Sequence, residues 1–363
     1  MTNQFFPSYT IGADAYDAVP GICGEYGKTA VIIGGGGSPS GEKPRAAAEP
    51  AIRKACEGQI EILGSFQYGE NSGFGPAKAL TEIPEVTQAD MIFAVGGGRA
   101  IDTAKIAAEY MHKPVFSFPT LCSNCPPVTA VCVAYHEDGS FQQVWYRTRP
   151  AYHTFINTEV IIHSPRDYFW AGIGDALSKQ YEVLFSIRGD EYVPYIRSLG
   201  AQMAGNCSDE LIRYGVAAME AFDRKEITED FERVVQLVIV TTGLVSNCLT
   251  GDYNSSVGHA IYNGHTEVEH DQEYLHGAVV CYGTLVLLTL DKQFEARDQM
   301  LDFCRALALP HCLADVGESL STAERLAEHA STKYDLDQSP YKVTKEMLLQ
   351  AILDLEELNR KAK

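Results

Sequence analysis

The chain has 363 residues, of which 45% are apolar and 21% charged, and its formal net charge at pH 7 is −19. This length suffices for two domains with separate cores. The negative charge disfavours nucleic acid and anionic membranes as partners, and no apolar run approaches the roughly 20 residues of a membrane helix. The first residues, MTNQFFPSYT, lack the features of a secretory signal, so we expect a cytoplasmic protein.

Strands and helices alternate in the N-terminal part of the chain. The predicted elements are, in chain order, a strand over 29–35, a helix over 44–58, strands over 60–66 and 90–98, a helix over 99–112 and a strand over 114–120. This alternation is typical of a parallel sheet covered by helices on both faces. A β-hairpin is predicted over 128–147, because both arms alternate around Asp138-Gly139.

From Pro165 onward, the apolar residues recur at helical spacing almost to the C-terminus. After a long helix that begins there, further helices are predicted over 195–222, 229–250, 275–292 and 344–362. The change in pattern predicts two domains, an α/β domain over 1–162 and an all-helical domain over 163–363.

Three glycines, Gly96, Gly97 and Gly98, end a predicted buried strand and begin a predicted helix. Backbone without side chains lets a pyrophosphate approach the amide groups, and the positive end of the helix favours its charge. A tight turn without a ligand is the alternative, but three consecutive glycines exceed what such a turn needs. We therefore expect phosphate binding here, although the G-x-G-x-x-G fingerprint of dinucleotide sites is absent.

A second glycine run, Gly34 to Gly37, follows another predicted strand and suits either the adenosine half of a dinucleotide or a flexible loop. NAD-preferring sites usually place an acidic residue at the end of such a strand. None stands there, whereas Lys43 and Arg45 lie slightly downstream. The pattern therefore leaves NAD and NADP both open as cofactors.

The dense histidine cluster in GHAIYNGHTEVEHDQEYLHG predicts a metal site, and a catalytic zinc has three protein ligands and an open position. His259 and His276 lie in apolar helical stretches, where each buried imidazole needs a partner. Asp175 offers a carboxylate in a similarly apolar stretch, a helix N-cap being its alternative role. His265 and His270 stand among acidic residues and are expected to be solvated.

Ten cysteines are scattered along the chain, and in a protein of this size most are expected to be reduced and buried. Cys122 and Cys125 form a Cys-x-x-Cys motif, which can be a redox pair or half of a structural zinc site. The sequence has no second such motif, and two prolines and a β-branched run follow in place of a helix. We therefore expect neither redox nor zinc chemistry at this pair.

Four stretches together resemble the iron-containing (group III) alcohol dehydrogenase family: GGGRAIDTAK, GIGDALSKQYE, GHAIYNGHT and LHGAVVCYGTLVLL. The likeness is greatest to its glycerol dehydrogenase and hydroxycarboxylate dehydrogenase branch, and it extends over almost the whole chain. The resemblance implies a dehydroquinate synthase-like fold, in which a nucleotide-binding α/β domain and a helical domain hold a metal and the active site in the cleft between them.

The resemblance also assigns site residues. It places the metal ligands on Asp175, His259 and His276. Lys179 stands where many iron-type members have a further histidine, and this favours zinc over iron. The implied nucleotide contacts are Gly96, Gly97, Gly98, Arg99, Asp102, Thr120, Ser123, Thr129, Val131 and Tyr135. Arg99 replaces the family's Ser or Lys and can pair with a pyrophosphate.

The residue at position 125 bears on the substrate. Glycerol dehydrogenases of this family carry an aspartate there that hydrogen-bonds a substrate hydroxyl, whereas the hydroxycarboxylate relatives carry a cysteine, as this chain does with Cys125. An aspartate repels a substrate that bears its own carboxylate, and a cysteine tolerates it. The resemblance therefore favours a 2-oxo acid/2-hydroxy acid pair, with glycerol-like polyols as the alternative.

The implied reaction is hydride transfer between NAD or NADP and a small carbonyl or alcohol substrate, with the metal acting as a Lewis acid on the substrate oxygen. His265 and a water chain are both open as the proton relay. The rivals are a dehydroquinate synthase-like lyase, disfavoured by the few basic residues near these motifs, and a non-catalytic nucleotide-binding protein. Relatives form dimers to octamers, so we expect a homo-oligomer.

Overall fold

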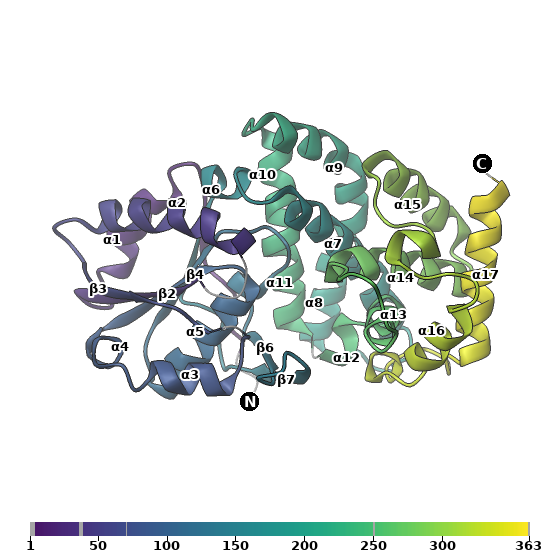
Figure 1. The fold of residues 1–363 in the computed structure, drawn as a ribbon, viewed down its shortest axis with the longest axis horizontal. Helices are drawn as coiled ribbons and strands as arrows, with labels where there is room; N and C mark the ends of the chain where they lie inside the picture. Colours follow the sequence, from purple (N-terminus) through teal and green to yellow (C-terminus); the bar gives the residue numbers. More distant parts are fainter. Residues whose placement is uncertain (1–3, 36–38, 70, 250, 362–363) are drawn as a thin grey trace. The chain divides into compact units, whose positions relative to one another are not determined.

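A computed structural model describes residues 4–35, 39–69, 71–249 and 251–361 (Figure 1). By packing, the chain divides into two compact units. The α/β unit comprises Met1–Phe169 and Ala221–Asn247, and the helical unit comprises Trp170–Glu220 and Cys248–Lys363. The predicted boundary between domains 1–162 and 163–363 stays a prediction, because packing alone does not define an independently folding domain.

The strands are β1 (Tyr9–Gly12), β2 (Thr29–Gly34), β3 (Glu61–Phe66), β4 (Met91–Gly96), β5 (Val115–Pro119), β6 (Val131–Tyr135), β7 (Phe141–Tyr146) and β8 (His153–Asn157). The α-helices are α1 (Val19–Cys23), α2 (Pro39–Cys56), α3 (Phe74–Leu80), α4 (Pro84–Gln88), α5 (Gly98–Tyr110), α6 (Thr158–Ile162), α7 (Arg166–Ile187), α8 (Tyr195–Ala204), α9 (Cys207–Arg224), α10 (Glu229–Gln236), α11 (Thr242–Cys248), α12 (Gly251–Asn254), α13 (Val257–His265), α14 (His276–Leu290), α15 (Phe294–Leu307), α16 (Ala323–Ala330) and α17 (Lys345–Lys361). Short turns are η1 (Ala15–Ala18), η2 (Pro126–Val128), the π-helical η3 (Leu237–Thr241), η4 (Leu313–Val316) and η5 (Tyr334–Leu336).

The α/β unit is built on a six-stranded sheet in the order β1-β8-β5-β4-β2-β3, and every neighbouring pair is parallel. The four strands predicted before the hairpin are β2, β3, β4 and β5, and the two helices predicted between them are α2 and α5. The α/β class predicted for this part of the chain is therefore confirmed. The predicted hairpin is also present, as the antiparallel pair of β6 and β7.

Two strands of the sheet were absent from the sequence prediction, β1 and β8. The reason is their polar content: β8 has the sequence HTFIN, and all five residues are buried. The ring of His153 lies 2.7 Å from Oγ of Ser8 and 2.9 Å from Oγ1 of Thr10, and the Asn157 side chain donates a hydrogen bond to the carbonyl of Ala13. These long-range hydrogen bonds offset the free-energy cost of burying polar side chains. No local sequence pattern reveals such partners.

Helices cover both faces of the sheet (Figure 1). Alternate residues of β2 point to opposite faces, so Ala30 and Ile32 join one core and Val31 and Ile33 the other. Side chains of α1 and α2 complete the first core, and those of α3, α4 and α5 complete the second. The residues of β2 therefore face an apolar core on each side, as expected for a central strand of a parallel sheet.

The strand order reverses direction beside β2. The chain passes from β2 to β3 on one side and then crosses to β4 on the other, after which β5 and β8 continue outward. In open α/β sheets, ligands bind at the carboxyl ends of the strands where the order reverses. Both glycine runs of the sequence lie at this point, because Gly34 ends β2 and Gly96 ends β4.

The rest of the described chain is helical, as predicted, but two predicted helices are interrupted. The helix predicted over 195–222 is two helices, since α8 ends with Gly205 as its C-cap and α9 begins at Cys207. The helix predicted over 229–250 contains the π-helical turn η3 between α10 and α11. Among the described residues, no helix combines the length and apolar character that crossing a membrane requires.

Candidate metal centre and nucleotide site

The three predicted metal ligands lie together in the helical unit, each on a different helix. Asp175 is in α7, His259 in α13 and His276 is the first residue of α14. One ligand atom from each residue can be chosen such that all three lie within 4.8 Å of one another. Because Asp175 lies in the interior of α7, its alternative role as a helix N-cap is excluded.

The geometry of this cluster fits a divalent cation. Oδ1 of Asp175 is buried and has no hydrogen-bond partner, which is costly for a carboxylate oxygen. Nε2 of His276 lies 3.3 Å from this oxygen and Nε2 of His259 lies 3.9 Å from it. Ligands at 2.0–2.2 Å from a tetrahedral zinc are separated by about 3.4 Å, so one ion can satisfy all three atoms.

Glu182, which the sequence analysis did not single out, fixes the orientation of His259. Its Oε2 lies 2.6 Å from Nδ1 of His259, and its Oε1 accepts hydrogen bonds from the backbone N–H groups of Ser256 and His259. A carboxylate that holds the far nitrogen of a ligand histidine sets its tautomer and strengthens its binding. The spacing in the sequence could have identified Glu182 as a neighbour of the cluster. It follows Asp175 by seven residues and therefore lies on the same face of the helix.

Electrostatic interactions couple the side chains of this cluster. Burial alone lowers the pKa of His259, but the carboxylates of Glu182 and Asp175 raise it to about 9. Burial alone raises the pKa of Asp175, but the imidazoles of His276 and His259 and the ammonium of Lys179 lower it below its ordinary value. The cluster thus retains a negative carboxylate and attracts positive charge, which a bound cation can supply in place of the proton on His259.

Glycines next to each ligand allow the three helices to approach. A β-carbon at Gly277 would lie 2.0 Å from the carbonyl oxygen of Ala171 and 2.9 Å from Cβ of Asp175, and one at Gly174 would lie 2.7 Å from the carbonyl oxygen of Gly277. A β-carbon at Gly258 would lie 2.9 Å from Oε1 of Glu182. The glycines that accompany the ligands in the sequence are therefore a packing requirement of the cluster.

Lys179 lies on the same helix as Asp175 but is not directed at a ligand position. Its Nζ donates a hydrogen bond to the backbone carbonyl of Asn254 at 3.2 Å. The side chain is largely buried, so its positive charge acts on Asp175 through a medium with little water. This arrangement agrees with a cluster of three protein ligands.

The predicted phosphate turn lies at the carboxyl end of β4. Gly96 has a φ of +151°, which few residues other than glycine adopt, and a β-carbon at Gly97 would lie 2.8 Å from Cδ1 of Leu121. Gly97 is the N-cap of α5 and provides no side-chain cap. The first N–H groups of this 13-residue helix are therefore available to an anion.

Asp102 and Lys105 of α5 contact the chain segment that follows β5. Asp102 pairs with Lys105 at 2.9 Å, and its Oδ2 accepts a hydrogen bond from the N–H of Val133. The buried Lys105 ammonium donates to the carbonyls of Pro126, Thr129 and Val131. Asp102 is only 3% exposed, so these contacts give it a structural role, and its predicted contact with a nucleotide stays a prediction.

The other predicted nucleotide contacts gather around the same edge. Thr120 follows β5, its N–H donates to the carbonyl of Gly96, and its buried Oγ1 has no hydrogen-bond partner. The guanidinium of Arg99 lies over the ring of Tyr135, 5.2 Å from its centroid. Thr129 and Val131 belong to the strand segment held by Lys105, and Ser123 lies in the loop between β5 and η2.

Part of the second glycine run can be followed in the structure. Arg45 donates a hydrogen bond from Nη1 to the carbonyl of Gly34 at 3.3 Å, directly at the end of β2. Gly36 and Gly37, and the side chain of Lys43, lie outside what the structure describes. Of the two predicted cations, Arg45 is therefore the one whose side chain can be placed, beside the end of β2.

Cys125 is partly exposed at the start of η2, and its Sγ lies 3.9 Å from Oγ of Ser246 in α11. Its neighbour Cys122 is fully buried, and burial raises the pKa of the Cys122 thiol. Neither cysteine forms a disulfide. A buried thiol with a raised pKa is a poor nucleophile, and the expectation that this pair has no redox role stays a prediction.

The expectation that His265 and His270 are solvated was wrong. His265 is 5% exposed, and both imidazoles contact the buried carboxylate of Glu318, at 3.1 Å and 2.9 Å. Glu318 lies 53 residues after His265, so the pairing is a property of the fold. The acidic residues next to the two histidines in the sequence had indicated that both side chains are exposed to solvent.

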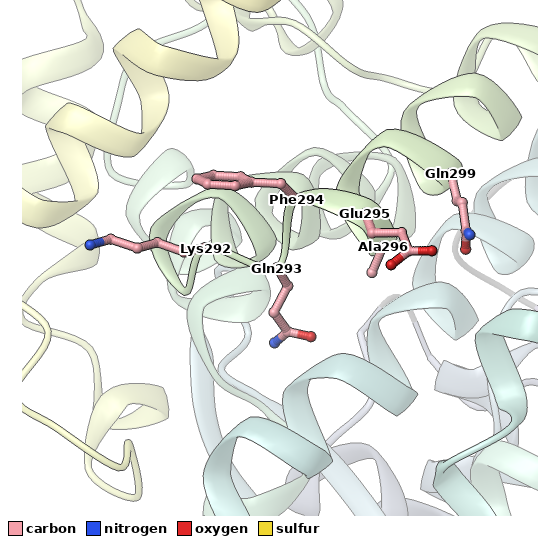
Figure 2. A pocket seen from close by; sticks show the side chains of 6 residues that line it. All are labelled: Lys292, Gln293, Phe294, Glu295, Ala296 and Gln299. Carbon is pink, nitrogen blue, oxygen red and sulfur yellow. The ribbon is translucent and has the colours of Figure 1, made fainter.

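A surface pocket lies at the start of α15. It is lined by Lys292, Gln293, Phe294, Glu295, Ala296 and Gln299 (Figure 2). None of the predicted ligands or nucleotide contacts lines it, and its polar side chains do not converge on a common point. We therefore do not place the active site there.

Comparison with known proteins gives a consistent result. Residues 7–157 match the family model described as iron-containing alcohol dehydrogenase. A glycerol dehydrogenase of Thermotoga maritima is 30% identical over 258 residues, which cover 69% of each chain. Hydroxycarboxylate dehydrogenase A of Escherichia coli K12 is 29% identical over 226 residues, 62% of each chain. Among solved structures, a probable glycerol dehydrogenase of Sinorhizobium meliloti 1021 aligns over 99% of this chain and 100% of its own, with a TM-score of 0.83 and 26% identity.

Proposed function

The chain belongs to the iron-containing alcohol dehydrogenase family and is an oxidoreductase acting on CH–OH groups, and from this premise we propose how it works. We propose that it transfers hydride between NAD or NADP and a small alcohol or carbonyl, with a divalent metal held by Asp175, His259 and His276. The observation that carries this proposal is the unpartnered Oδ1 of Asp175 with two imidazole nitrogens 3.3 and 3.9 Å away.

Each part of the proposed site has a defined task. A divalent cation, when bound, polarises the substrate oxygen as a Lewis acid and stabilises its negative charge. Glu182 keeps Nδ1 of His259 protonated, so that Nε2 is directed towards Asp175. The N–H groups at the start of α5 bind the pyrophosphate, and Asp102 and Lys105 hold the adjoining strand segment in place.

We propose zinc as the metal. Two nitrogen ligands and one oxygen ligand, with a further position left open, are the usual set of a catalytic zinc. Lys179, which is bonded to Asn254, occupies the place of the additional histidine expected at an iron site. Reconstitution of the metal-free protein with Zn²⁺ and with Fe²⁺ under anaerobic conditions tests this choice, and restoration of turnover by Fe²⁺ alone would refute it.

Two substrate classes follow from different observations. The glycerol dehydrogenase relatives support a small polyol and its oxidation product. Cys125, in place of an aspartate, supports a 2-oxo acid/2-hydroxy acid pair, and the hydroxycarboxylate relative agrees with it. We place the polyol first, because more relatives carry that name, and thereby reverse the order that position 125 alone suggested.

Substitution of Cys125 separates the two substrate classes. If position 125 selects the substrate, Cys125→Asp raises kcat/KM for glycerol and 1,2-propanediol relative to 2-hydroxybutyrate, because the carboxylate accepts a hydrogen bond and repels an anion. Cys125→Ser is the matched control, since it keeps a small neutral side chain. An unchanged ratio in Cys125→Asp would exclude position 125 as the selector.

The choice of nucleotide is tested by titration. Arg45 lies at the end of β2, where the adenosine ribose binds in dinucleotide sites, and a guanidinium there favours a 2′-phosphate. We expect Arg45→Ala to weaken NADPH binding more than NADH binding. A large preference of the unaltered protein for NADH would remove any role for Arg45 in selecting the nucleotide.

The first experiment is turnover of NADH and NADPH against a panel of small carbonyls and alcohols, combined with metal analysis of the same preparation. Metal-dependent oxidation or reduction supports the proposal, and the dehydrogenase and reductase relatives favour that result over a lyase. Nucleotide binding without turnover of any panel member at full metal content would contradict it. The expected homo-oligomer and cytoplasmic location stay predictions.

A further inference from the structure

A second group of potential metal ligands lies in the helical unit, apart from the residues assigned above. It consists of His265 at the end of α13, His270 in the loop between α13 and α14, and Glu318 just after η4. A ligand atom from each lies within 4.8 Å of the others. The side chain of Glu318 is inaccessible to solvent, and those of His265 and His270 are 6% and 10% exposed.

Only one of the two carboxylate oxygens of Glu318 contacts the histidines. Nδ1 of His265 and Nε2 of His270 both approach Oε1, at 3.1 and 2.9 Å, whereas Oε2 is buried and has no hydrogen-bond partner. If hydrogen bonds alone held this group, two imidazole donors would be expected to satisfy both oxygens, because an unpaired buried oxygen is destabilising. Convergence of two nitrogens and one oxygen on a single point is the arrangement that a metal ion produces.

The surrounding chain favours a cation. The loop between α13 and α14 has four acidic residues, Glu267, Glu269, Asp271 and Glu273, and no lysine or arginine. Glu267 pairs with Lys333 and His329, and the other three carboxylates raise the local affinity for a positive ion. The loop spans ten residues without regular structure, and a metal ion would join it to Glu318.

The backbone around the group is shaped to present these ligands. Tyr274 packs edge-on against both imidazoles, with ring centroids 5.5 Å from His265 and 5.8 Å from His270. Gly317, immediately before Glu318, has a φ of +72°, and a β-carbon there would lie 2.4 Å from the hydroxyl of Tyr274. The turn that carries Glu318 therefore depends on a glycine both for its conformation and for its contact with Tyr274.

From these observations we propose that His265, His270 and Glu318 bind a second divalent metal ion, of the zinc class. Two imidazoles and a carboxylate suit zinc better than calcium or magnesium, which prefer oxygen ligands alone. The site is nearly closed to solvent and contains none of the residues assigned above to the first metal or to the nucleotide. We therefore assign His265 to a structural site in place of a proton relay, and the metal would anchor the loop that leads into His276. This inference does not depend on the proposed function.

Zinc stoichiometry of the full-length chain tests the inference. The protein is stripped with a chelator, dialysed against buffered Zn²⁺ and analysed for bound metal per chain, together with Glu318→Gln, His270→Asn, Asp175→Asn and the double variant Asp175→Asn/Glu318→Gln. We expect two zinc ions in the unaltered protein, one in each single variant and none in the double variant. Far-UV circular dichroism of every variant verifies that it is folded.

A measurement that needs no change at the second site guards against variants that fail to fold. Co²⁺ titration of Asp175→Asn, followed by its visible absorption, is expected to show one tightly bound ion in a site with nitrogen and oxygen ligands. A folded Glu318→Gln chain that holds as many zinc ions as the unaltered chain would overturn the inference. Absence of Co²⁺ binding to folded Asp175→Asn would overturn it as well, whereas loss of turnover in that variant bears only on the proposed function.

Discussion

The helical unit contains two groups in which two imidazoles meet one carboxylate, and they are built differently. At Asp175, three helices supply one ligand each, and the side chains are 18–38% exposed. At Glu318, the ligands come from a helix end, a loop and a turn, and they are at most 10% exposed. Catalytic metal sites keep a position open to substrate and structural sites are closed, so the difference in accessibility supports the proposed catalytic role of the first group and the proposed structural role of the second.

The largest effect is expected for Asp175→Asn. Replacing the carboxylate by an amide removes the negative ligand, so the metal of the first group is lost and kcat/KM falls by about 1,000-fold or more. Steady-state kinetics with metal analysis checks this. Asp167→Asn, an exposed position in the first turn of the same helix, is the matched control and should retain activity. Full turnover by a metal-free Asp175→Asn protein would end the Lewis-acid account.

A smaller effect is expected for Glu182→Gln. The amide retains the size of the side chain but removes the charge that holds Nδ1 of His259, so metal affinity should fall by about 10- to 100-fold. Activity at limiting Zn²⁺ should fall in proportion and recover at high Zn²⁺, which a variant that is merely misfolded would not do. Equal metal affinity in Glu182→Gln and the unaltered protein would show that Glu182 has no positioning role.

Gly277→Ala tests whether close helix packing assembles the first group. The added methyl group would meet the carbonyl of Ala171, and relieving that clash should cost about 1–3 kcal/mol in the free energy of unfolding and weaken zinc binding. Denaturant unfolding and zinc titration measure the two effects. Gly75→Ala in α3 is the control, because a β-carbon there meets no atom within 4 Å and should be neutral or slightly stabilising.

The two groups also differ in how far the sequence predicts them. Asp175, His259 and His276 are polar residues within apolar helical stretches, so burial and mutual contact could be anticipated without a fold. Glu182 required only the helix spacing from Asp175, a signal that was present but not used. His265 and His270 were assigned to solvent, because their partner Glu318 lies about 50 residues away and nothing in their own neighbourhood reveals it.

In the sheet of the α/β unit, too, the sequence predicts apolar elements but not polar residues that are buried through long-range contacts. Strands β2, β4 and β5 are apolar and were predicted, as was the glycine turn at Gly96 that follows from their order. Strand β8 was missed, because the burial of His153 and Asn157 depends on partners in the first part of the chain. Residues whose environment is set by long-range contacts therefore escape prediction in both units.

The smallest effect is expected for Glu318→Gln. If the second group fastens the loop that leads into His276, this change should leave kcat/KM at saturating Zn²⁺ unaltered and lower Tm by a few degrees when Zn²⁺ is present. The difference in Tm should vanish in chelator, because neither protein then holds the second ion. A difference in Tm that persists without metal would mean that Glu318 stabilises the fold through hydrogen bonds alone.

Anomalous diffraction at the zinc absorption edge, from crystals of the protein reconstituted with Zn²⁺, tests the central claim most directly. The account predicts a strong peak bonded by Oδ1 of Asp175 and by Nε2 of His259 and of His276, each at 2.0–2.2 Å. Well-ordered crystals in which these three side chains surround no anomalous density, while the protein in solution turns over substrate, would contradict it.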